Sequence, residues 1–259
     1  METHIMKHWE KNCFGEKIKG TDLKIILKYI VLLLLLISFQ LNSQRNEIGF
    51  LFGGSNYIGD VGPTTYIDPV SYGTYSYGIL YRNNFSDRFS VRTQISISDI
   101  QSSDLNSNSP EYRKLRGKSF ENSVQEVTVG IDFNFTEFDV QDDKFQFSPY
   151  VSTGLSYFRY DGIHYPLGQT IAQSYGKSSD FALPITIGIK SKLLQTLVFG
   201  IEITARHTFT ENLDGSYPNF ENTEIYSEKR FGSGLSQDWI VFSGLTLTYV
   251  FGNYECKCQ

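Results

Sequence analysis

Six ionisable residues in the second half of the chain are the candidates for acid–base chemistry. Beyond residue 43 the sequence contains two histidines, His164 and His207. A histidine beside a carboxylate can serve as a general base in hydrolysis or acyl transfer. The acidic residues that could meet them in the folded protein are Asp161, Asp180, Glu211 and Asp214. No G-x-S-x-G, H-E-x-x-H or comparable catalytic spacing accompanies them, so the sequence predicts a protein that is not an enzyme.

Two cysteines near the end of the chain are the other reactive residues. Cys256 and Cys258 are separated by one residue, and Cys13 lies in the N-terminal leader. A metal site would need ligands that this short tail lacks, so the sequence predicts no metal and no cofactor. A disulfide between the two cysteines is strained, because it requires a sharply bent tripeptide. A local disulfide and a disulfide to a partner protein both remain open.

An apolar segment near the N-terminus predicts a secretory signal peptide. Residues 29–41 are rich in Leu and Ile and follow a lysine-rich segment. The apolar segment spans about 13 residues, fewer than the ~20 that a helix needs to cross a bilayer. We therefore predict that residues 1–43 form a signal peptide, cleaved after Ser43. A retained N-terminal anchor helix is the alternative.

Eight segments beyond residue 43 alternate apolar and polar residues with the period of a β-strand. They are approximately 47–54, 74–82, 88–98, 124–135, 145–160, 181–192, 197–206 and 238–252. Long polar connections, 55–73, 99–121, 161–180 and 210–237, alternate with the short turns 83–87, 136–144 and 194–196. Strict alternation, aromatic residues at strand ends and alternating connection lengths are typical of a transmembrane β-barrel.

The sizes of the alternating residues favour this barrel over a soluble one. In the last segment bulky apolar residues occupy one face, while Gly244, Thr246 and Thr248 occupy the other. A lipocalin-like barrel, the soluble alternative, would place its bulky residues in a narrow interior. We predict an all-β, eight-stranded antiparallel outer-membrane β-barrel over residues 44–252. An even number of strands places both termini on the periplasmic side, with residues 253–259 as a periplasmic tail and the long connections outside the cell.

The charge balance bears on the partners of the mature chain. Removal of residues 1–43 takes away six basic and four acidic residues and leaves a net charge of −7. Nucleic acid is therefore excluded as a partner, because phosphate binding needs a concentrated basic surface. The abundant aromatic residues, 17 Tyr and 20 Phe, suit contact with outer-membrane lipid at two interfaces.

Charged residues at inward positions of the predicted strands suggest how the interior is filled. The basic ones are Arg82, Arg92, Lys190 and Arg206, and the acidic ones are Glu126, Asp132 and Glu202. In an eight-stranded barrel these side chains should form a paired network that excludes a conducting channel. A proton or solute path along the same residues is the alternative.

Both ends of the predicted barrel resemble a known protein family. Residues 48–49 read IG, residues 53–60 read GGSNYIGD, residues 77–82 read YGILYR, and LTYVFG at 247–252 precedes the C-x-C tail. These features resemble the PorG-type outer-membrane barrels of the type 9 secretion system, the protein export and gliding machinery of Bacteroidota. As a strand pattern, the resemblance extends over essentially the whole mature chain.

The resemblance implies a non-enzymatic barrel that docks, from its periplasmic side, onto a ring formed by a lipoprotein and its partner protein. Cys256 and Cys258 are the residues that we expect to contact that ring, because their tail follows the last strand. The long lead before the signal segment departs from the family pattern. Ring docking does not explain the long acidic connections, which favour the alternative of a surface adhesin or an immune-evasion barrel.

Overall fold

The computed structural model describes residues 45–64, 74–106, 108–142, 144–218, 230–232 and 237–252. These residues all belong to one compact unit, Gln44–Gln259. The predicted signal peptide and the tail with Cys256 and Cys258 lie outside the described residues. Among the described residues, no helix is long and apolar enough to cross a membrane.

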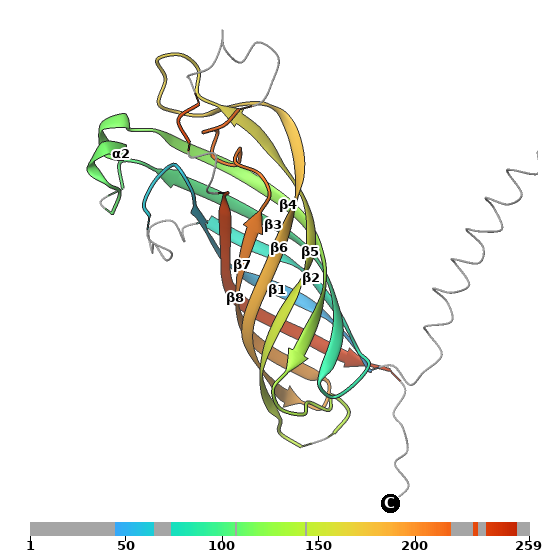
Figure 1. The fold of residues 1–259 in the computed structure, drawn as a ribbon. Helices are drawn as coiled ribbons and strands as arrows, with labels where there is room; N and C mark the ends of the chain where they lie inside the picture. The colour runs from blue at the N-terminus through green and yellow to red at the C-terminus, as the bar shows by residue number, and fades with distance from the viewer. Residues whose placement is uncertain are drawn as a thin grey trace, which may run out of the picture. The chain divides into compact units, whose positions relative to one another are not determined.

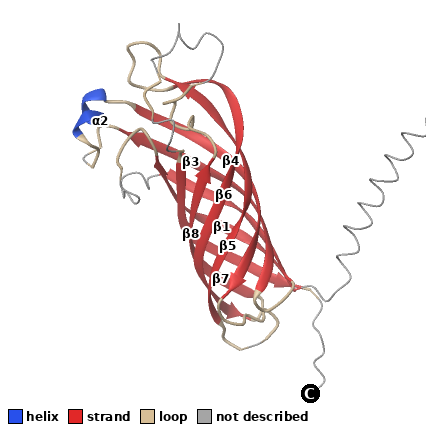
Figure 2. Ribbon diagram, viewed as in Figure 1, coloured by secondary structure: helices blue, strands red, loops and turns tan. Residues whose placement is uncertain are grey.

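Eight antiparallel strands form a closed barrel, as the alternation predicts. Each strand pairs with its neighbours in the sequence, and the first pairs with the last (Figures 1 and 2). The strands are β1 Arg45–Ile58, β2 Thr74–Asn84, β3 Phe89–Ser103, β4 Ser119–Asn134, β5 Phe147–His164, β6 Gln173–Leu194, β7 Leu197–Thr208 and β8 Trp239–Phe251. Ring closure gives the strands of the wall a hydrogen-bonding neighbour on both sides, which a strand within hydrocarbon requires. The predicted fold class is confirmed.

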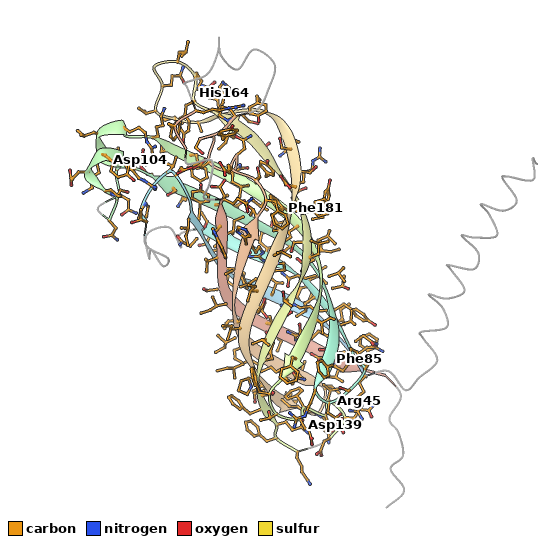
Figure 3. All side chains as sticks on the ribbon, viewed as in Figure 1. Arg45, Phe85, Asp104, Asp139, His164 and Phe181 are labelled. Atoms are coloured by element: carbon orange, nitrogen blue, oxygen red, sulfur yellow. The ribbon has the colours of Figure 1, made fainter. Side chains whose placement is uncertain are left out.

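The two ends of the barrel carry different connections. At one end, which we call the loop end, the strands are joined by the connections 59–73, 104–118, 165–172 and 209–238. The opposite end, which we call the turn end, carries Arg45, Phe251 and the short turns. Figure 3 places His164 and Asp104 at the loop end, with Phe85 and Asp139 at the turn end.

Apolar side chains face outward along every strand and polar ones face inward. Phe50 is 69% exposed and Ile187 is 66% exposed, whereas Ser76 and Thr248 are fully buried. The inward residues between the two ends are mostly Ser, Thr, Gly and charged residues, and Leu51, Leu80, Tyr150 and Phe242 are among the buried apolar and aromatic exceptions. This arrangement is the reverse of a soluble barrel and suits a wall that faces lipid. The lipocalin-like alternative is therefore wrong.

Two glycines of β1 allow the barrel to close against β8. A Cβ atom on Gly49 would lie 2.0 Å from the carbonyl oxygen of Leu247, and one on Gly53 would lie 2.2 Å from that of Ser243. No side chain tolerates such contacts with backbone atoms, so the seam between the first and last strands requires glycine at these positions.

Several strands extend further toward the loop end than the sequence predicted. β1 ends at Ile58, β3 at Ser103 and β5 at His164, while β4 begins at Ser119 and β6 at Gln173. The predicted loops 99–121 and 161–180 therefore contain the ends of two hairpins, and the first also contains the short helix α2, Glu111–Arg116. The extensions carry mostly polar residues on their outward face, because they project past the lipid-facing wall. Their inward face includes buried apolar residues such as Ile100, Phe120 and Ile163.

We predict that a charge at the centre of the lipid-facing wall destabilises the barrel. Ile185 lies midway along the exposed apolar positions of β6, and Leu194 lies at its turn-end limit. Ile185→Lys should lower the free energy of unfolding in phospholipid vesicles by roughly 2–4 kcal/mol, and Leu194→Lys by about 0–1 kcal/mol. Equal losses at both positions in urea titrations would contradict the assigned lipid face.

Candidate functional site

Arg82 of β2 is the centre of a buried charged network inside the barrel. Its Nε donates to Oδ2 of Asp132 on β4 at 2.8 Å. Its Nη1 lies 3.5 Å from Oε2 of Glu47 on β1, and its Nη2 lies 3.8 Å from Oε2 of Glu202 on β7. All four side chains are buried. One guanidinium therefore links four strands across the interior.

Glu202 connects a second arginine to this network. Nη2 of Arg92 on β3 donates to both carboxylate oxygens of Glu202, at 2.6 and 2.8 Å. The hydroxyl of Tyr150 on β5 also donates to Glu202. Charge-assisted and bidentate contacts of this kind are the strongest hydrogen bonds in proteins and fix side-chain geometry.

Arg206 and Glu126 form a separate ion pair beside the network. Nε of Arg206 on β7 lies 2.7 Å from Oε2 of Glu126 on β4, and both side chains are buried. A cavity of about 10 Å³ borders Arg206 and Arg92. That volume holds about one water molecule.

The turn between β4 and β5 closes the turn end of the barrel. Phe138 and Val140 of this turn are buried against Val198 and Val250. Nζ of Lys192 donates to the carbonyl oxygen of Val140 at 2.7 Å. The sequence predicted segment 136–144 only as a charged turn. It is instead a plug, because the turn folds inward and places two apolar side chains in the barrel mouth.

Lys190 is the member of the predicted network that does not form an ion pair within the described residues. Its Nζ lies 4.6 Å from the ring centre of Phe138 and 5.8 Å from that of Tyr150. Aromatic faces attract a cation electrostatically, so the plug supplies part of the environment of this ammonium group.

Glu47 is a buried acid that the sequence reasoning did not assign to the network. Its Oε1 accepts a hydrogen bond from Nδ2 of Asn84 at 2.9 Å, and its Oε2 accepts one from Oγ1 of Thr248 at 2.7 Å. With Glu47 added, the predicted set of inward charges consists of four acidic and four basic side chains, all of them buried. Glu47 lies two and four positions before the inward residues Gly49 and Leu51, and alternate residues of a strand face the same side. This spacing is the signal that could have identified Glu47.

A cluster of buried apolar side chains closes the loop end. It consists of Tyr57, Val61, Ile100, Phe120, Val124, Phe158, Tyr160, Ile163, Tyr165, Ala182, Leu213 and Ile240. The rings of Tyr57 and Phe120 meet edge to face, with centres 4.8 Å apart. The interior is thus filled at three levels: the plug, the charged network and this loop-end cluster.

Two buried carboxyl groups fasten the connection after β7 to the loop-end cluster. The hydroxyl of Tyr57 donates to Oδ1 of Asp238 at 2.5 Å, and the backbone N–H of Leu213 donates to Oδ2 at 3.0 Å. Oδ2 of Asp214 accepts from the backbone N–H of Val61 at 3.1 Å. We call Asp214 and Asp238 the carboxyl latch, because they join segment 209–218 to the ends of β1 and β8.

Burial raises the pKa of both latch residues above the ordinary value of an aspartate. The negative charge of Asp214 raises the pKa of Asp238 further, and Asp60 acts on both in the same direction. Hydrogen bonds from Tyr57 and from backbone N–H groups oppose this shift without cancelling it. Both carboxyl groups therefore retain their protons to a higher pH in the folded latch than an exposed aspartate does.

The six candidate acid–base residues do not assemble into one group. Asp161 pairs with Nζ of Lys177 at 2.8 Å, Asp214 belongs to the latch, and the ring of His207 packs 4.7 Å from that of Trp239. His164 ends β5, whereas Asp180 of β6 and Glu211 of the connection after β7 border one groove, with Asp214 near Glu211. No cluster of three or more His, Cys, Asp or Glu residues able to hold a metal occurs among the described residues.

Residues 25–259 match the model of a family described as "Domain of unknown function (DUF6089)", so the chain belongs to that family. A search of curated proteins finds no match. The strand order therefore establishes the fold, and the family description adds no activity.

Solved structures with a similar strand arrangement are small outer-membrane proteins. The attachment invasion locus protein Ail of Yersinia pestis is 11% identical, with a TM-score of 0.41, and the match covers 81% of this chain and 100% of Ail. Neisserial surface protein A is 9% identical, with a TM-score of 0.41 and coverage of 81% and 98%. OprG of Pseudomonas aeruginosa is 11% identical, with a TM-score of 0.39 and coverage of 81% and 95%.

We predict that the Arg206–Glu126 pair stabilises the folded barrel because each side chain neutralises the buried charge of the other. Arg206→Met and Glu126→Gln should each lower the free energy of unfolding by about 3–5 kcal/mol, because each leaves one charge buried without its partner. The double variant should lose clearly less than the sum of the two, as measured by urea titration in vesicles. Additive losses would show that the two side chains are not coupled.

We predict that the carboxyl latch weakens as the pH rises. The pKa values are raised in the folded protein, so the stabilisation is complete below about pH 4 and is lost as the pH passes the folded-state values. Trp239 follows Asp238 directly and is the one tryptophan beyond residue 43, so its emission reports on the latch.

The emission of Trp239 should titrate with a midpoint above the ordinary pKa of an aspartate. Asp238→Asn should flatten that titration, because it keeps a neutral group in place. Asp161→Asn, which removes a surface carboxylate paired with Lys177, is the matched control and should leave the curve unchanged. An unaltered titration in Asp238→Asn would rule out the latch as its source.

Proposed function

We propose that this DUF6089 protein is a non-enzymatic outer-membrane anchor of the type 9 secretion machinery, with both termini in the periplasm. In this proposal the turn end holds a periplasmic ring of a lipoprotein and its partner protein. The observation that carries the proposal is the filling of the barrel at three levels, by the plug, the charged network and the loop-end cluster. A barrel filled in this way offers a rigid support rather than a path for solutes.

The turn end offers a surface suited to docking. Phe145, 77% exposed, lies in the turn between β4 and β5, and the exposed Leu193 and Leu194 end β6 at the same end of the barrel. Arg45 of β1 ties the β4–β5 turn to the β2–β3 turn, because its Nη1 lies 3.1 Å from Oδ1 of Asp139 and pairs with Asp87. Short turns held by ion pairs present apolar side chains in fixed positions, which favours a stable protein interface.

The resemblance of residues 53–60 and of the C-terminal segment to PorG-type barrels supports the identity of the partner. Cys256 and Cys258 follow β8 by a few residues and are proposed to contact the ring, through a disulfide if they do not bridge locally. An exposed cysteine pair in an oxidising compartment is expected to be oxidised.

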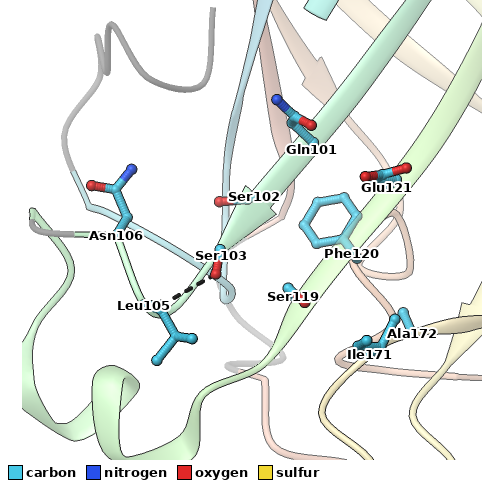
Figure 4. A pocket seen from close by; sticks show the side chains of 10 residues that line it. All are labelled: Gln101, Ser102, Ser103, Leu105, Asn106, Ser119, Phe120, Glu121, Ile171 and Ala172. Carbon is cyan, nitrogen blue, oxygen red and sulfur yellow. Dashed lines mark hydrogen bonds between the residues drawn. The ribbon is translucent and has the colours of Figure 1, made fainter. Parts of the chain in front are cut away.

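A surface adhesin or immune-evasion barrel is the second candidate. The observation that favours it is a cavity of about 860 Å³ at the loop end, between the β3–β4 hairpin and the segment around Ile171 (Figure 4). Leu105 and Ile171 border it as exposed apolar side chains, and Leu115 of α2 nearby is 89% exposed. Exposed apolar residues of this kind mark protein interaction sites.

We predict that photocrosslinking distinguishes the two candidates. A photoreactive phenylalanine analogue at Phe145 should crosslink to periplasmic ring proteins in whole cells, while the same analogue at Leu115 should not. Both positions are strongly exposed, so they are matched in access. Crosslinks from position 115 to external ligands, with none from position 145, would favour the adhesin instead.

Non-reducing electrophoresis of the same membranes provides a second readout. A species heavier than the monomer should disappear with reductant and in the Cys256→Ser, Cys258→Ser double variant. A monomer without free thiols would establish the local disulfide, and docking would then depend on the turns alone.

A further inference from the structure

One strand of the barrel continues past the end of its neighbour. β6 spans 22 residues and β7 spans 12. Their pairing begins at Ala182 opposite Thr208, whereas β6 pairs with β5 as far as Gln173 opposite His164. Within the described residues, positions 173–181 of β6 therefore have a ladder partner on one side only. Figure 1 shows β5 and β6 rising past the loop-end limit of β7.

The backbone groups of this edge point toward the missing neighbour. The N–H of Phe209 donates to the carbonyl oxygen of Phe181 at 3.0 Å, and among the described residues this is the last backbone bond on the β7 side. Alternate residues of a strand direct their N–H and C=O groups to the same side. Lys177 and Ser179 therefore direct theirs to the open side, and both residues are exposed.

A groove of about 610 Å³ lies along this edge, where a continuation of β7 would run. Its walls include Ser179 and Asp180 of β6, Phe209 and Glu211 of the next connection, and Tyr217 with Arg230. A strand added beside another lies about 4.8 Å away, and the groove borders the open edge at Ser179 and Asp180.

The groove is acidic and partly aromatic. Asp180 and Glu211 line it, and the nearby carboxyl groups of Asp60 and Asp214 help burial to raise the pKa of Glu211. Arg230 is the one cation in the described lining and is outnumbered by the two carboxyl groups; its guanidinium lies 4.0 Å from the ring centre of Tyr217 and donates to the carbonyl oxygen of Pro218. A ligand with positive charges would complement this surface.

We propose that the open edge of β6 binds an extended, positively charged polypeptide segment of a partner protein by strand addition. The backbone groups of Lys177 and Ser179 pair with the backbone of the segment. Alternate side chains of the segment contact Phe209 and Tyr217, and its cationic groups lie near Asp180 and Glu211. Only another peptide backbone matches the spacing of an open strand edge, which favours a polypeptide over a saccharide. The proposal goes beyond the anchor function, which concerns the opposite end of the barrel.

The test uses a fluorescent ten-residue peptide of alternating Thr and Lys, with blocked termini, and the mature protein in lipid nanodiscs. Fluorescence anisotropy measures binding. Two matched peptides distinguish the contribution of backbone hydrogen bonds to binding from that of peptide charge. One carries N-methyl groups on alternate amides, and the other replaces Lys by Glu. We expect both to bind at least about tenfold more weakly, since about 1.4 kcal/mol corresponds to a factor of ten.

Matched protein variants test the edge itself. Ser179→Pro removes an N–H that points to the open side and leaves the β5 ladder intact, so it should weaken binding about tenfold. Ser179→Ala keeps that N–H and should bind as the wild type does. Hydrogen exchange at the amides of Lys177 and Ser179 should slow when the Thr–Lys peptide is added.

Four results would overturn the proposal. The first is that the N-methylated peptide binds as tightly as the unmodified one, and the second is that no peptide binds at concentrations up to about 1 mM. The third is that the amides of Lys177 and Ser179 are already protected from exchange in the free protein. The fourth is that the protein forms concentration-dependent dimers that compete with the peptide. The last would assign the edge to a second copy of the chain. The peptide comparison does not depend on the variants, so a misfolded Ser179→Pro protein leaves the test decisive.

Discussion

The structure depends on the neutralisation of charge inside a narrow barrel. A guanidinium or carboxylate removed from water costs several kcal/mol unless an opposite charge and hydrogen bonds compensate for it. Arg82 satisfies this requirement by reaching acids on three other strands, Glu47, Asp132 and Glu202. These contacts fix the distances between strands that are not neighbours in the wall. Backbone pairing closes the ring, and the network determines what fills it.

The plug and the loop-end cluster follow from the same requirement. Ion pairs are strong only where water is excluded, because the attraction falls steeply with the local dielectric constant. Phe138 and Val140 keep solvent from the network at the turn end, and the cluster around Tyr57 and Leu213 does so at the loop end. The charged interior therefore depends on its apolar closures, and both make the barrel rigid.

The sequence predicted the parts that depend on local alternation. Eight strands and their lipid faces were confirmed, because a residue such as Ile187 must be apolar wherever it meets hydrocarbon. The polar hairpin ends at Ser103 and Gln173 were missed, since they project past the lipid and obey no such pattern. The inward fold of Phe138 was missed for another reason: a turn shows no period, so only tertiary packing reveals which side chains enter the barrel. Spacing also could not show that Asp161, Asp214 and His207 have separate partners.

Residues 53–60, GGSNYIGD, contribute to the wall and to the loop end of the barrel and not to the turn end. Gly53 allows the close seam with β8, and Tyr57 anchors the carboxyl latch, so this segment builds the wall and the loop end. The proposed docking surface lies at the turn end, and the open edge of β6 lies at the loop end. The filled interior separates the two surfaces. Binding at the two ends is therefore expected to be independent, which allows one barrel to hold a periplasmic assembly while its outer edge engages a separate polypeptide.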